Sequence, residues 1–142
     1  MRDISMVLER WAGWAASDGS GVDYSHIAAG FKGLLAQKGC LRPSCTDNDG
    51  LIIEKCLARL KEKRPSEYQL LVAHYLYQVS KRKLARWRKR DEKMIRIEMQ
   101  MAEGFIDGCL AVLDVRLEMD PEVEIPENSH KTLSRSANYV LV

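Results

Sequence analysis

Six apolar residues between positions 95 and 113 recur in steps of four, three, four, three and four. They are Ile95, Met99, Ala102, Ile106, Cys109 and Leu113. This spacing places all six on one face of an α-helix, close to a heptad repeat, whereas in a strand alternate residues share a face. The sequence therefore predicts a long helix over residues 91–118 with one face packed into a core. A helix–helix interface with another protein is the alternative.

The same periodicity predicts five further helices, and we find no strand-rich region. The predicted helices span residues 3–17, 24–36, 49–63, 66–78 and 80–87. Residues that favour helix N-caps stand at their starts and at the start of the long helix. These residues are Asp3, Asp23, Asp47 or Asn48, Ser80 and Asp91, while Ser66 starts the helix after Pro65. We therefore expect an all-α fold with a compact helical domain.

A chain of 142 residues, 46% hydrophobic and 30% charged, is large enough for one domain with a core. The helical pattern stops after Met119, and Pro121 and Pro126 follow. We expect a single all-helical domain over residues 1–120 and a flexible, extended tail over residues 121–142. The apolar end of the tail is either a frayed terminus or a docking peptide.

Residues 80–96, SKRKLARWRKRDEKMIR, concentrate the positive charge. Nine basic and two acidic residues give this segment a net charge of +7, whereas the whole chain carries +2. The basic residues are Lys81, Arg82, Lys83, Arg86, Arg88, Lys89, Arg90, Lys93 and Arg96. Neighbouring cations repel one another, and phosphates offset that repulsion. The segment indicates a nucleic-acid-binding surface; a solvated helix face and an arginine-rich RNA-binding helix are the alternatives.

The arrangement of this segment predicts a helix-turn-helix over about residues 80–104. A short helix is followed by a turn and by the start of the long helix, whose N-terminal turns would enter the major groove of DNA. Leu84 and Ala85 face inward, Ile95 anchors the second helix, and Trp87 is expected to pack rather than to stack on a base. The predicted base-reading residues are Glu92, Lys93 and Arg96. The predicted phosphate contacts are Lys81, Arg82, Arg86, Arg88, Lys89 and Arg90.

Other kinds of site are poorly supported. His26, His74 and His130 are scattered, and no nucleophile elbow, phosphate loop or metal-binding helix motif appears, so we expect neither an enzyme nor a cofactor. Cys40 and Cys45, with Cys56 or His26, have a spacing at the edge of that of zinc sites. Burial of reduced cysteines on apolar helix faces is the favoured interpretation. With no apolar run long enough for a membrane span and no signal peptide, we expect a cytoplasmic protein.

Several stretches resemble the lambdoid phage Q antitermination proteins, in the branch typified by Q of phage 21 and by defective-prophage relatives. They are MRDISMVLERWAGWAA, IAAGFKGL, the RP before Cys45, CLARLK and AEGFIDGCLAVLDVRLEMD. The resemblance covers about residues 1–120.

The helix-turn-helix of that family is similar to the promoter-reading domain of sigma factors, region 4. By position, Ala85 matches its small residue, Asp91 its recognition-helix cap and Ala102 its packing alanine; Glu92, Lys93 and Arg96 match its base-facing positions. Two departures stand out. Gln78 and Lys89 replace glycines of such domains, so a positive φ at either position implies strain.

The resemblance implies a phage late-gene transcription antitermination factor. Such proteins bind double-stranded DNA near the late promoter, load onto host RNA polymerase holoenzyme paused downstream, and travel with the elongation complex. The resemblance also implies a ring at the RNA exit channel through which nascent RNA threads, so that terminator hairpins cannot form. Lys32, Lys38 and Arg42 are candidates for its lining. The alternative is a conventional sequence-specific helix-turn-helix regulator that acts without polymerase.

Overall fold

A computed structural model describes residues 2–17, 20–30 and 42–120. In this part of the chain there are six helices and no strand, which confirms the prediction of an all-α fold. The helices are α1 (Ile4–Ala16), α2 (Ser25–Gly30), α3 (Asp47–Lys63), α4 (Pro65–Tyr75), α5 (Lys81–Arg88) and α6 (Glu92–Leu113). The predicted tail and residues 31–36 of the predicted second helix lie outside the described residues. The domain boundary at residue 120 stays a prediction.

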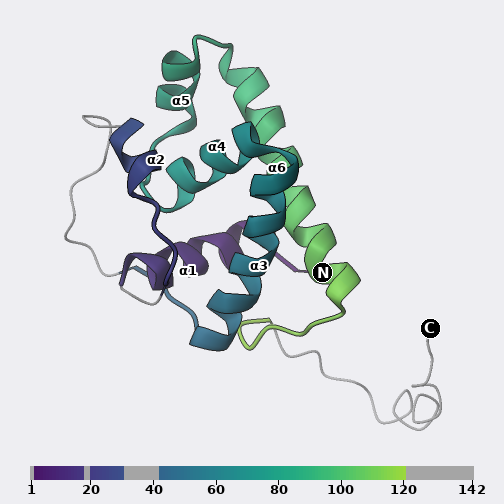
Figure 1. Cartoon of the computed structure of the whole chain (residues 1–142). Helices are drawn as coiled ribbons and strands as arrows, with labels where there is room; N and C mark the ends of the chain where they lie inside the picture. Colours follow the sequence, from purple (N-terminus) through teal and green to yellow (C-terminus); the bar gives the residue numbers. More distant parts are fainter. Residues whose placement is uncertain (1, 18–19, 31–41, 121–142) are drawn as a thin grey trace, which may run out of the picture.

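The core lies between α3, α4 and α6, which pack against one another, while α1 contacts all three (Figure 1). α5 packs mainly on α6, at the opposite end of the molecule from α1. The predicted stripe of α6 is fully buried at Ile95, Met99, Ala102 and Ile106. In the last turns Leu110 is buried instead, and Leu113 is 51% exposed. The prediction was wrong there because a 3.5-residue repeat drifts around a helix of 3.6 residues per turn.

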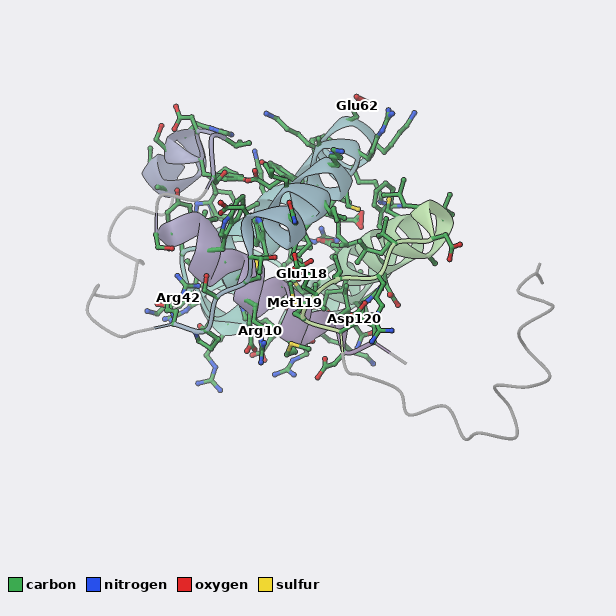
Figure 2. All side chains as sticks on the ribbon, turned by 90° about the horizontal axis from the view of Figure 1, so that it is seen from below. Arg10, Arg42, Glu62, Glu118, Met119 and Asp120 are labelled. Atoms are coloured by element: carbon green, nitrogen blue, oxygen red, sulfur yellow. The ribbon has the colours of Figure 1, made fainter. Side chains whose placement is uncertain are left out.

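α6 also ends five residues earlier than predicted. Asp114 has a φ of 53°, in the left-handed region, and the helix does not continue. The buried carboxylate of Asp49 accepts hydrogen bonds from the backbone N–H groups of Glu118 and Met119 at 2.8 and 2.9 Å. Figure 2 shows Glu118, Met119 and Asp120 close together after this turn. The segment that follows α6 is thus held by contacts with a residue some 70 positions away, which no local pattern reveals.

The start of α3 holds α1 in place. Thr46, rather than Asp47 or Asn48, is the N-cap, since its side chain accepts a hydrogen bond from the N–H of Asp49 at 3.3 Å. The indole N–H of Trp14 in α1 donates to Asp47 at 2.8 Å. The same ring lies against Gly50, where a Cβ would stand 2.4 Å from it. Only glycine therefore allows this approach between α1 and α3.

Candidate nucleic-acid interface

Two capped helices joined by a short turn form the basic segment. The Ser80 hydroxyl accepts a hydrogen bond from the N–H of Lys83 at 3.2 Å at the start of α5. The Asp91 carboxylate accepts one from the N–H of Lys93 at 3.4 Å at the start of α6. Both caps have extended backbone, as N-caps require. The predicted caps are therefore confirmed, and Arg88 extends α5 one residue beyond its predicted end.

The turn after α5 places a lysine in a backbone conformation that favours glycine. Lys89 has a φ of 54° and a ψ of 45°. Its N–H donates a hydrogen bond to the carbonyl of Arg86 at 3.2 Å, and the N–H of Arg90 donates one to the carbonyl of Ala85 at 3.0 Å. These two bonds form the pattern of a Schellman motif. Gln78 has a φ of 59°. It follows α4, which ends at Tyr75, three residues earlier than predicted. Both positions where we expected strain thus have the positive φ that implies it.

The two helices are held together from within. Leu84 and Ile95 are fully buried and Ala85 is nearly so, which confirms their predicted inward positions. Trp87, predicted to be a packing residue, is 40% exposed, so it is not part of the core. The guanidinium of Arg88 lies 4.8 Å from the centre of its ring, in cation–π contact. The indole is therefore part of the basic surface.

The predicted base-reading residues lie together at the N-terminal end of α6. Lys93 and Arg96 are exposed and Glu92 is half-buried. The Nε of Arg96 donates to Glu92 at 3.0 Å, and the Nε of Arg82 lies 3.8 Å from the other carboxylate oxygen. The hydrogen bond from Arg96 lowers the pKa of Glu92, and the nearby guanidinium groups add to this effect. Glu92 is therefore a charged group shared by two arginines.

The predicted phosphate contacts differ in what they bind in the free protein: Arg82 pairs with Glu92, two arginines contact other parts of the fold, and the rest form no ion pair with any described residue. Arg88 donates to the backbone carbonyl of Ser66 and to the side chain of Gln69, both at 3.2 Å, and burial lowers its pKa. Arg90 is paired with the largely buried Glu98 of α6. These two arginines hold α5 and the turn against the rest of the fold. Lys81, Arg86 and Lys89 form no ion pair with any described residue. The same holds for Lys83 of α5 and for Lys93, a predicted base-reading residue, which gives a group of five cations without such a pair.

Sequence reasoning missed a second apolar stripe on α6. Met94, Ile97 and Met101 are 41%, 41% and 45% exposed. Their spacing of three and four residues places them on the side of the helix away from Ile95 and Met99. The sequence already contained this signal. A helix with apolar residues on two opposite faces can bury only one of them in its own core, so the other apolar face is expected to point outward.

The family described as "Phage antitermination protein Q" matches residues 1–118. The chain belongs to this family. It is 52% identical over 136 residues to a "Probable antitermination protein Q" of Acyrthosiphon pisum secondary endosymbiont phage 1, with 94% of this chain and 92% of that protein covered. It is 48% identical over 120 residues to the "Prophage antitermination protein Q homolog QuuD" of Escherichia coli (strain K12), with 84% and 94% covered.

A solved structure shares the fold. The match is to "Transcription antitermination factor Q21", with a TM-score of 0.57 and 15% sequence identity. The alignment covers 78% of this chain and 89% of that one. At this identity the likeness concerns the arrangement of helices, and side-chain roles in the Q-family chain rest on its own geometry.

The predicted RNA-lining residues are only partly visible in this Q-family chain, because Lys32 and Lys38 lie outside the described residues. Arg42 donates to the carbonyls of Tyr75 and Leu76 at 2.6 and 3.0 Å, at the end of α4. Burial lowers its pKa. Arg42 also lines an open pocket of about 380 Å³ near Ser80. Its guanidinium therefore supports the connection between α4 and α5.

The zinc alternative finds no support in the part of the chain that the structure describes. No group of three histidine, cysteine or acidic side chains there could hold a metal ion, and Cys40 lies outside that part. Burial raises the pKa of Cys45 to about 11 and that of Cys56 to about 12, so both thiols stay protonated near neutral pH. Among the described helices, none has the length and hydrophobicity needed to cross a membrane.

Proposed function

We propose that this Q-family antitermination factor binds double-stranded DNA through α5 and the N-terminal turns of α6. Lys93 and Arg96, with Glu92, would face base edges in the major groove, while the cations of α5 and the turn would contact phosphates. The observation that carries the proposal is the group of five lysine and arginine side chains, defined above, that form no ion pair within the described part of the chain. On random duplex, where Lys93 has no preferred base to read, all five side chains would meet phosphates, so log K should fall with log [salt] at a slope of about −4 to −5.

Bound near the late promoter, the protein would load onto host RNA polymerase holoenzyme paused just downstream and stay with the elongation complex. Narrowing of the RNA exit channel around the nascent RNA would then keep terminator hairpins from forming. Membership of the antitermination protein Q family supports this sequence of events. Lys32, Lys38 and Arg42 remain the proposed lining of the RNA path. All of these partners belong to the cytoplasm of the bacterial host.

The test is transcription by host polymerase holoenzyme on the phage late-promoter region, with a strong terminator downstream. We expect the full chain to raise readthrough several-fold, and Arg86→Ala to require more protein for the same effect. Arg59→Ala is the matched control, because Arg59 is an exposed arginine of α3 outside the basic segment. Unchanged readthrough with intact DNA binding would instead favour a conventional helix-turn-helix regulator.

A further inference from the structure

One acidic side chain in the basic segment joins the two helices of the proposed DNA-binding surface. The carboxylate of Glu92 lies between Arg82 of α5, at 3.8 Å, and Arg96 of α6, at 3.0 Å. We call these three residues the Glu92 clamp. The side chains of Arg82 and Arg96 are 81% and 59% exposed, and that of Glu92 is 31% exposed. Two arginines predicted to contact DNA are thus paired with an anion in the free protein.

The position of Glu92 gives this pairing a consequence for DNA binding. Glu92 is the first residue of α6, where the partial positive charge of the helix N-terminus attracts any anion. A DNA phosphate would be attracted to the same place. The carboxylate therefore competes with the phosphates of DNA of any sequence, both for the helix N-terminus and for the two arginines that it holds.

We propose that the Glu92 clamp weakens binding to non-cognate DNA and opens at a site that offers a base amino group to the carboxylate. The exocyclic amine of cytosine in the major groove is such a donor, and it replaces the hydrogen bond from Arg96. Arg96 is then free to bind a neighbouring guanine, and Arg82 a phosphate. Glu92 is in this view a specificity-determining residue that acts against the wrong sequences. The inference rests on the proposed DNA binding.

The first variant to make is Glu92→Gln, which keeps the size of the side chain and removes its charge. The full chain is used first to select preferred duplexes from a randomised pool. Affinities for a selected duplex and for random duplex are then measured across salt concentrations. Releasing two exposed ion pairs should tighten binding to random duplex about threefold to thirtyfold and steepen its salt slope by about one to two. The ratio of selected to random affinity should fall about tenfold, because a neutral amide binds the cytosine amine less strongly.

Asp107→Asn is the matched control. It removes one negative charge from a half-exposed position of the same helix, about 22 Å along the axis from Glu92. That distance exceeds the screening length of about 10 Å at 0.1 M salt, so the control should change both affinities by less than about twofold. If Glu92→Gln raised both affinities by one common factor, general repulsion would explain the effect and the clamp proposal would be wrong.

The same experiment separates this inference from the proposed function. If the wild-type chain enriches no duplex from the randomised pool, it does not bind DNA sequence-specifically, and the clamp proposal is wrong as well. An enriched pool with an affinity ratio that Glu92→Gln leaves unchanged overturns the clamp proposal alone. Helicity and the urea midpoint of each variant show that the fold is intact.

Discussion

Replacement of Lys89 by glycine should stabilise the protein although it removes a side chain. Lys89 has a φ of 54° and a ψ of 45°, a conformation that disfavours an L-residue by about 1–2 kcal/mol per residue. Glycine has no such strain, but its greater freedom in the unfolded chain offsets about 0.4–1 kcal/mol. The net gain expected for Lys89→Gly is therefore about 0.5–1 kcal/mol in the free energy of unfolding.

Urea unfolding measures this gain directly. With a slope m of about 1–3 kcal/mol/M for a small domain, the midpoint should rise by roughly 0.2–1 M while m stays constant. Lys89→Gln is the necessary control, because it removes the same charge from a repulsive cluster without relieving the backbone. Arg86→Gly is the second control, because glycine inside α5 should destabilise the helix by about 1 kcal/mol.

The comparison of glycine with glutamine at position 89 decides the outcome. If both variants had the same midpoint, the gain would come from charge and the left-handed turn would not be strained. If Lys89→Gly were less stable than the wild type, the Schellman geometry of the turn would be wrong. Lys89→Gly should also shallow the salt slope of DNA binding by about 0.9 if the lysine contacts a phosphate, so the more stable protein should bind DNA less tightly.

Three further predictions use the same protein and assays. Arg96→Ala should lower the ratio of selected to random DNA affinity by about 1–3 kcal/mol if Arg96 reads a guanine, and an unchanged ratio would mean that α6 does not read bases through this residue. Arg86→Ala should weaken binding to all duplexes equally and shallow the salt slope by about 0.9, whereas a sequence-dependent loss would place Arg86 on a base. Asp120→Asn should remove part of the acid sensitivity of folding, which unfolding titrations at several pH values measure. Hydrogen bonding to Arg2 lowers the pKa of Asp120 in the folded state, so its stabilisation is present above the unfolded pKa of about 3.9 and is lost as pH falls through the folded pKa. Wild type and Asp120→Asn should therefore differ in stability at pH 7 and converge in strong acid, and a constant difference would show that the charge is irrelevant.

The starts of α5 and α6 could be predicted from sequence because their causes are local. Ser80 and Asp91 cap the helix that follows them within three residues, and Leu84 and Ile95 lie at helical spacing from those caps. Such signals depend on neighbours in the chain, which a sequence displays directly. The path of the chain after α6 involves instead the contact of Glu118 with Asp49, which a local pattern could not predict.

The candidate site follows the same division. The pairing of Glu92 with Arg96 is visible in sequence as an acid and a base four residues apart on a helix. The engagement of Arg88 with Ser66 joins residues 22 positions apart, and only the packing of α4 beside α5 brings them together. Composition therefore identified a basic segment, but it could not separate cations that support the fold from cations that are exposed.

That separation changes what the charge of the segment means for binding. If all nine basic residues met phosphates, the salt slope would be about −8. The five side chains that have no ion pair with a described residue predict a slope of about −4.5, and opening of the Glu92 clamp would add at most two contacts, for about −6. Slopes near −4.5 on random duplex and near −6 with Glu92→Gln would match both proposals. A slope near −8 would mean that Arg88 and Arg90 leave Ser66 and Glu98 on binding, so that α5 moves relative to α4.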